Sequence, residues 1–137
     1  MLEISVCSSH PTIHGLPESA LHEVARATTL ARLLYASPAW WGFASASDRT
    51  RVERFLQRTI RMGYLPHALP DAAVLVSETE TRLLASVVLR PHHVLRPLLP
   101  TVMIRRPGLR PRPHNFVLPD KDDCNFIPRI LYRALLQ

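Results

Sequence analysis

Prolines set the first limit on the fold of this chain, because more than half of them lie in one segment. The sequence has 137 residues and 13 prolines, and seven of the prolines fall between Pro91 and Pro119. Each proline removes a backbone donor and clashes with the preceding turn, so no long helix can run through this segment. We therefore expect residues 90–119 to form an extended arm with some polyproline II character. Any helical domain must lie outside it.

The same segment carries the net positive charge. The formal net charge is +6, and residues 1–89 and 120–137 each hold as many cations as acids, so the whole excess lies in residues 90–119. Nearly all the cations are arginines, whose planar guanidinium pairs with phosphate and stacks on bases. The arm thus supplies candidate nucleic-acid-binding residues, namely Arg105, Arg106, Arg110, Arg112 and His114. The alternative is a solvated basic linker.

Apolar periodicity predicts a helical domain over residues 15–89. Pro17 opens the first helix, since the first turn does not need the N–H that proline lacks. The Ser-Pro pair at 37–38 ends or kinks that helix. Later in the domain we expect a short helix over residues 71–78 and a further helix that continues to Leu89.

The helix between these is amphipathic and carries a stripe of arginines. It begins at an N-cap of Ser45 or Ser47 and ends before Gly63. On a helical wheel its apolar residues and its arginines fall on opposite sides. The arginines are Arg51, Arg54, Arg58 and Arg61. They are candidate phosphate contacts, and the alternative is a solvated face beside Glu53 and Gln57.

Both ends of the chain differ from its middle. Residues 1–14 lack a clear period and are expected to be extended or disordered. Residues 120–137 are expected to contain a C-terminal helix that begins at Asn125, which places Pro128 in its first turn. The predicted fold class is therefore mainly α: a small helical bundle, a Pro/Arg-rich extended arm and a C-terminal helix.

No residue pattern indicates a metal, cofactor or catalytic site. His22-Glu23 lacks the second histidine of a zinc-protease helix, because Arg26 stands in its place. The other histidines and the two cysteines lack ligand spacing, and the Asp122-Asp123 pair is better explained as a helix cap. We expect no cofactor, no metal ion and no small-molecule substrate.

The sequence also carries expectations about location. It shows no signal-peptide pattern and no apolar stretch of the length that a membrane span needs. The two cysteines, far apart, are typical of a reducing compartment. We therefore expect an intracellular protein, in the cytoplasm or nucleus, with no membrane partner.

Several short motifs follow one another in a recognisable order: HGLPESALHEV, LLYASPAWWGFASASDRTRVERFLQR, PHHVLRPLLP, LRPRPHNFVLP and DCNFIPRILY. Together they cover most of residues 14–133. This order resembles the region that follows the polymerase palm in non-LTR retrotransposon reverse transcriptases of the jockey-like kind. Pro128 departs from the usual last motif, which leaves the start of that helix open.

The resemblance implies a helical thumb, which packs beside the palm and holds the template–primer duplex, followed by a C-terminal tail. It implies that Tyr35, Trp40, Trp41 and Phe43 are core and interface aromatics. It also implies that Arg51, Arg54 and Arg58 match the basic helix after the tryptophan pair, and that Arg110, Arg112 and His114 match the tail motif.

The catalytic part of that family is missing from this chain. The aromatic-Ala-Asp-Asp hairpin, which would hold two metal ions for nucleotide addition, is absent from the sequence, and so is a Cys/His zinc knuckle. The sequence therefore predicts a fragment of an RNA-directed DNA polymerase without enzymatic activity. Its expected partners are RNA or DNA backbones and a polymerase palm domain. Two alternatives stay open: a helical protein-interaction module, and a transposon remnant without function.

Overall fold

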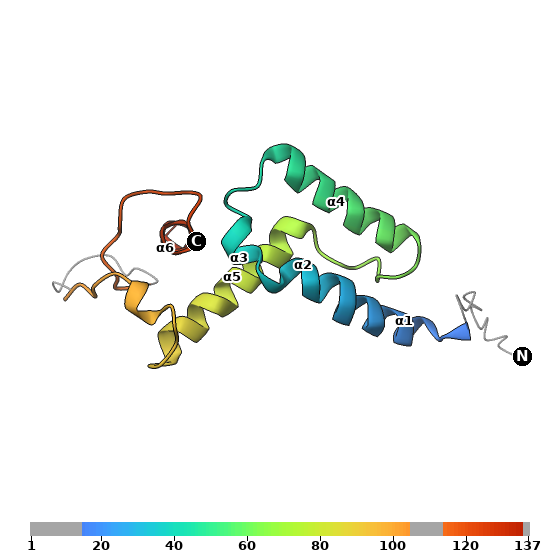
Figure 1. Ribbon diagram of the computed structural model, residues 1–137, viewed down its shortest axis with the longest axis horizontal. Helices are drawn as coiled ribbons and strands as arrows, with labels where there is room; N and C mark the ends of the chain where they lie inside the picture. The colour runs from blue at the N-terminus through green and yellow to red at the C-terminus, as the bar shows by residue number, and fades with distance from the viewer. Residues whose placement is uncertain (1–14, 105–113, 136–137) are drawn as a thin grey trace, which may run out of the picture.

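The computed structural model describes residues 15–104 and 114–135, which form a mainly helical fold (Figure 1). The elements in chain order are α1 (Glu18–Ala25), a π-helical turn η2 (Arg26–Leu30), α2 (Ala31–Tyr35), α3 (Ser37–Trp40), α4 (Ala46–Arg61), α5 (Ala72–Leu89), a 3₁₀ turn η3 (Arg96–Leu98) and α6 (Phe126–Ala134). The predicted fold class, a small bundle of helices, is confirmed.

The first helix of the domain is continuous from α1 through η2 to α2. Its junction residues, Ala25 and Leu30, keep helical backbone angles, so the π-helical turn is a local widening of one helix. The helix ends at Ala36, whose φ of −116° and ψ of 17° leave the helical region. Pro38 then lies in the first turn of α3, where its missing N–H is not needed. The predicted break at the Ser-Pro pair is confirmed.

Helix α4 has well-formed ends. At its N-terminus Ser45 and Asp48 form a reciprocal capping box, in which the Asp48 N–H donates to Ser45 Oγ at 3.2 Å and the Ser45 N–H donates to Asp48 Oδ2 at 3.3 Å. At its C-terminus Gly63 takes a φ of 78°, and the N–H groups of Gly63 and Tyr64 donate to Ile60 and Thr59. This is a Schellman ending, so local sequence signals define both ends of the helix.

Helix α5 corrects the prediction of two separate helices over residues 71–89. It runs without a break for 18 residues. Its polar stretch includes Thr79 and Thr81, whose hydroxyls donate to carbonyls four residues earlier, each at 2.9 Å. Their polar groups are therefore satisfied within the helix. Packing overrides the weak helix propensity of this stretch, because Ala72, Val76, Glu80 and Val87 are buried along the length of α5.

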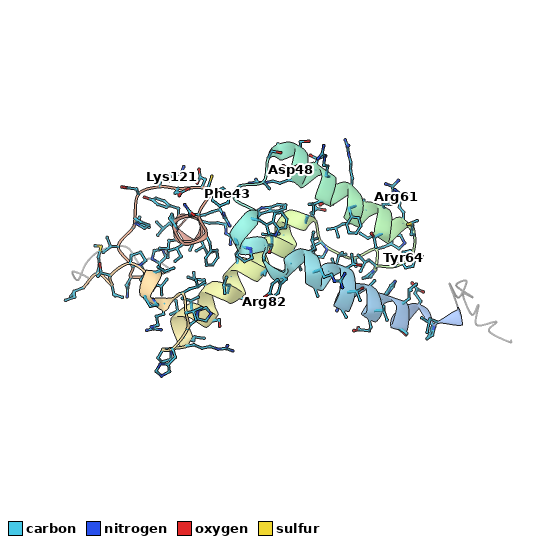
Figure 2. The ribbon with its side chains drawn as sticks, viewed as in Figure 1. Phe43, Asp48, Arg61, Tyr64, Arg82 and Lys121 are labelled. Carbon is cyan, nitrogen blue, oxygen red and sulfur yellow. The ribbon has the colours of Figure 1, made fainter. Side chains whose placement is uncertain are left out.

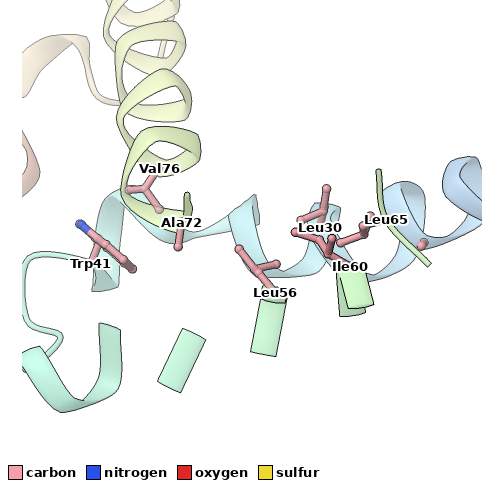
Figure 3. Close-up of a cluster of buried hydrophobic side chains, with 8 residues drawn as sticks. Leu30, Trp41, Leu56, Ile60, Leu65, Ala72 and Val76 are labelled. Carbon is pink, nitrogen blue, oxygen red and sulfur yellow. The ribbon is translucent and has the colours of Figure 1, made fainter. Parts of the chain in front are cut away.

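The hydrophobic core lies where the end of α1, η2, α4 and the start of α5 meet (Figure 3). Trp41 contributes its ring to this core and is 9% exposed, whereas Trp40 is half-buried and packs against it. The two indole rings meet edge to face with centroids 5.5 Å apart. The remaining buried members are Ala25, Leu30, Leu56, Ile60, Leu65, Ala72 and Val76. The helix break at Pro38 thus turns a tryptophan into the core.

The described parts of the proline-rich segment are not an extended arm. Thr101 and Met103 pair with residues across the segment: the Met103 N–H donates to Asn115 at 2.7 Å, and the Val117 N–H donates to Thr101 at 2.8 Å. An isolated antiparallel bridge joins Val102 to Phe116. The flanks of the segment therefore return onto each other, because pairing satisfies backbone groups that polyproline II would leave to solvent.

The C-terminal helix belongs to the same fold. Asn125 is the N-cap of α6, as predicted, and Pro128 lies in its first turns. The Tyr132 hydroxyl donates to the Pro119 carbonyl at 2.9 Å, which ties the helix to the segment before it. In Figure 1, α6 lies beside the middle of α5, on the opposite side of the molecule from the N-terminal end of α1. Within the described residues, no helix combines the length and the apolar character needed to cross a membrane.

Candidate nucleic-acid interface

Four of the five arginines of α4 form one exposed surface, called here the α4 arginine face: Arg51, Arg54, Arg58 and Arg61. The opposite side of the helix buries Leu56 and Ile60 in the core. Figure 2 labels Asp48 and Arg61, which lie near the two ends of this helix. Because the apolar side packs inward, the arginines must face solvent, as the helical wheel predicts.

Most of this face is not neutralised by acids. Arg51 lies 3.7 Å from Asp48, and both side chains are more than half exposed, so this pair is weak. Arg61 donates from Nε to the Gln57 carbonyl at 3.3 Å. Among the described residues, Arg54, Arg58 and Arg61 form no ion pair with a carboxylate. Their charge is available to an anion.

Glu53 is the acid nearest to this face in sequence, but its carboxylate serves another helix. Its Oε2 accepts the Ala72 N–H at 2.8 Å and so caps the start of α5. Its Oε1 accepts from Gln57 at 3.0 Å. The positive end of the α5 dipole therefore offsets the charge of Glu53.

A hollow of about 570 Å³ lies beside the arginine face, between α4 and the start of α5. Arg49, Arg54 and Arg61 contribute to its lining, together with Glu53 and Trp41. Arg49 lies over the Trp41 ring, 5.2 Å from its centroid, and donates to the Trp41 carbonyl at 3.0 Å. Arg49 is thus fixed at the edge of the core, while the arginine face points outward.

Asp48 helps to hold the first turn of this face in place. Its hydrogen bonds with the Ser45 hydroxyl and the Ser45 N–H lower the pKa of Asp48, and the Arg51 charge lowers it further. The carboxylate is therefore ionised at neutral pH. Asp48 therefore contacts both the Ser45 cap and Arg51, the first arginine of the face.

The other predicted nucleic-acid residues are placed less favourably or lie outside the described residues. Four of them lie outside the described residues: Arg105, Arg106, Arg110 and Arg112. His114 is half-buried, and its Nδ1 accepts the Phe116 N–H at 3.3 Å. The proton must then lie on Nε2, which donates to the Leu131 carbonyl at 3.0 Å. This corrects the prediction for His114, because both ring nitrogens are used inside the fold and none is left for a phosphate.

The four predicted core or interface aromatics divide into two pairs. Trp41 and Trp40 pack in or against the core. Tyr35 is 89% exposed and Phe43 is 64% exposed, so neither is a core residue. Both remain candidates for an interface, because large exposed aromatic rings are typical of contact surfaces.

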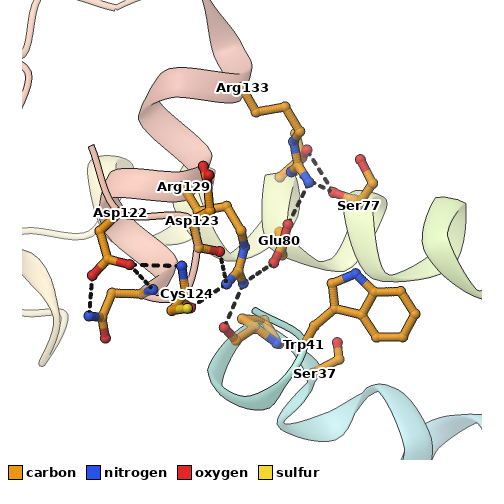
Figure 4. Close-up of polar contacts among 12 residues, drawn as sticks. Ser37, Trp41, Ser77, Glu80, Asp122, Asp123, Cys124, Arg129 and Arg133 are labelled. Carbon is orange, nitrogen blue, oxygen red and sulfur yellow. Dashed lines mark hydrogen bonds and ion pairs between the residues drawn. The ribbon is translucent and has the colours of Figure 1, made fainter. Parts of the chain in front are cut away.

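A buried ionic cluster was missed by the sequence reasoning (Figure 4). Glu80 of α5 is fully buried, and both its carboxylate oxygens are paired with arginines of α6. Arg129 contacts Oε1, and Arg133 contacts Oε2 at 2.5 Å. Arg129 also donates to the Pro38 carbonyl at 2.9 Å and to the Cys124 carbonyl at 2.5 Å. One turn of α6 thus brackets a single carboxylate.

The sequence did hold a signal for this cluster. Ala72, Val76 and Glu80 stand four residues apart, so Glu80 occupies a core position of α5. Arg129 and Arg133 are also four residues apart and lie on one face of α6. An acid on an apolar stripe indicates a buried partner, but nothing local in the sequence identifies that partner.

Within the described residues, no group of three or more histidine, cysteine, aspartate or glutamate side chains is arranged to hold a metal ion. Comparison of the chain with protein families, with curated proteins and with solved structures finds no match. The interpretation of the site therefore depends on its own geometry and charge.

Proposed function

We propose that this chain is the thumb and tail region of a mobile-element reverse transcriptase without its catalytic palm, and that it binds nucleic acid backbones without sequence preference. The observation that supports this function best is the α4 arginine face, whose charge is exposed and mostly unpaired with acids among the described residues. A rigid helix presents it, with both ends capped. Phosphate contacts of this kind supply affinity but read no bases.

The spacing of the arginine face suits a phosphate backbone. Arg51 and Arg61 are ten residues apart, which is about 15 Å along a helix that rises 1.5 Å per residue. One strand of a duplex carries a phosphate roughly every 3.4 Å of helix axis, so this length covers about four phosphates. Four arginines over that distance match the charge on one strand.

The test is a salt titration of binding by fluorescence anisotropy, on one duplex and one single strand of unrelated sequences. Replacing Arg54, Arg58 and Arg61 with alanine should flatten the log–log salt slope on duplex by about 2 to 3 units, at roughly 0.9 per phosphate contact. The loss should be similar for all sequences, and larger on duplex than on single strand if the helix lies along a duplex.

A matched control removes the same charge elsewhere. Arg26, Arg32 and Arg82 are exposed arginines of the other helices, so replacing them with alanine also lowers the net charge by three. This control should change the slope by less than about one unit. Equal effects of the two triple variants, or no effect of either, would reject the α4 arginine face as the binding surface. No detectable binding of the wild-type chain to the duplex or the single strand would reject the proposed function.

An apolar groove favours a second candidate function, a helical protein-interaction module. The groove has a volume of about 710 Å³, and Tyr35, Pro38 and Ala39 of the tryptophan-containing segment lie in its wall. Amphipathic helices bind grooves of this character. If Tyr35→Ala abolished binding to a protein partner and left nucleic-acid binding unchanged, this function would be favoured over the first.

A further inference from the structure

The described residues fall into two parts, before and after residue 90. The helical part, residues 15–89, contains the whole hydrophobic core shown in Figure 3. The C-terminal part, residues 90–104 and 114–135, packs against α5 outside that core. Where the two parts face each other they leave the apolar groove open, with Leu83 on one wall and Phe126 and Ile127 on the other. An open groove lacks close packing, so these walls add little to the docking of the two parts.

The closed contact between the two parts is the Glu80 cluster. Glu80 is fully buried, while the Arg129 and Arg133 side chains are 13% and 30% exposed. Ile130 and Leu131 of α6 are buried on the same helix and supply apolar attraction. Glu80 nevertheless decides whether the contact can form, because a buried carboxylate is tolerated only when its partners are in place.

We propose that the Glu80–Arg129–Arg133 cluster is a latch that holds the C-terminal part on the helical part, and that its release separates the two walls of the apolar groove. In the released form all three charges regain water, so the open form is not penalised as an exposed hydrophobic core would be. Interfaces between parts of one chain permit relative motion unless they are large and hydrophobic. A partly docked arrangement, with one arginine away from Glu80, would leave a buried charge unpaired. The C-terminal part is therefore either fully docked or fully released.

The backbone around the cluster allows the C-terminal part to dock in one position only. Arg129 donates to carbonyls of both parts, Pro38 in α3 and Cys124 just before α6. Gly42 lies against the same place, and a Cβ there would overlap with the Cys124 carbonyl and the Arg129 guanidinium. A contact without spare room cannot slide, so the C-terminal part is either seated or released.

Native-state hydrogen exchange followed by mass spectrometry tests this proposal on the full chain. Glu80→Gln keeps the shape of the side chain and removes its charge. Amides of α6 should lose protection by roughly 100-fold, as expected for breaking a buried ion pair, while amides of α4 should change by less than about threefold. Binding of an apolar dye should rise in the same variant, because Ile130 and Leu131, which are buried while α6 is docked, become exposed.

The matched control is Glu78→Gln, two residues away on the same helix. Glu78 pairs with Arg82 at 3.4 Å on the exposed side, so its loss should leave α6 protection within about threefold of wild type. A second variant, Glu80→Met with Arg129→Met and Arg133→Leu, removes all three charges together. It should keep α6 docked, with protection at or above the wild-type level.

Two results would overturn the latch. The first is an equal loss of protection in α4 and α6 of Glu80→Gln, which would make the two parts one cooperative unit. The second is a Glu80→Gln variant that behaves like Glu78→Gln. If Glu80→Gln does not fold, the wild type decides: α6 should open more readily than α4, and identical opening of the two helices would reject the latch.

Discussion

Gly42→Ala should undock α6 without changing any charge, because the reason for this glycine is steric. Gly42 does not take a positive φ, unlike Gly15 and Gly63, so alanine fits its backbone conformation. The added Cβ, however, would overlap with the Cys124 carbonyl and the Arg129 guanidinium. The guanidinium can move, whereas the carbonyl belongs to the backbone that leads into α6. The methyl group therefore fits only if the start of that helix moves away.

The size of the effect follows from two opposing contributions. Overpacking a close contact costs about 1 to 3 kcal/mol. We expect a cost at the upper end of this range, because the atom that the new methyl group meets belongs to the backbone. Alanine also restricts the unfolded chain, which offsets about 0.4 to 1 kcal/mol. We expect a net loss of about 2 kcal/mol in the free energy of unfolding of the segment that contains α6.

Urea unfolding followed by circular dichroism, together with hydrogen exchange of α6, measures this loss. Gly15→Ala is the matched control, since it makes the same substitution where no atom lies within 4 Å. Its cost should be the backbone strain of a φ near 73° alone, about 1 kcal/mol, confined to the region before α1. Stability of Gly42→Ala within about 0.5 kcal/mol of wild type, with unchanged α6 protection, would refute the close approach.

Three further predictions concern the helical part. Leu56→Ala should destabilise the chain by about 2 to 5 kcal/mol in urea unfolding, because Leu56 is buried in the core, and a loss below 1 kcal/mol would contradict that burial. Glu53→Ala should cost about 1 kcal/mol by removing the acceptor of the Ala72 N–H, with the change seen as faster exchange at the start of α5 and not of α6. Ser45→Ala should raise the pKa of Asp48 in an NMR titration, because the hydrogen bond from the Ser45 hydroxyl, the largest cause of the lowering, is lost, while the backbone N–H of residue 45 still donates. Since a lowered carboxyl pKa stabilises the fold above the unfolded pKa, wild-type stability from this cap should fade as the pH drops below about 4, and the variant should show a weaker dependence.

Local signals in the sequence were sufficient for much of the helical part. The caps of α4, the break at Pro38 and the N-cap of α6 each depend on residues within about four positions of one another. Such spacings act within one turn of backbone, so they hold whatever the rest of the chain does. The exposed arginine face follows in the same way, because the periodicity of a single helix separates its apolar and charged sides.

Tertiary structure decided what these local signals left open. It made one helix of α5, returned the flanks of the proline-rich segment onto each other, and placed Tyr35 and Phe43 in solvent. It also joined Glu80 to Arg129 and Arg133, which are 49 and 53 residues away in sequence. Periodicity could show that Glu80 occupies a core position, but not which helix supplies its partners. That choice depends on which faces bury each other, a property of the packed chain as a whole.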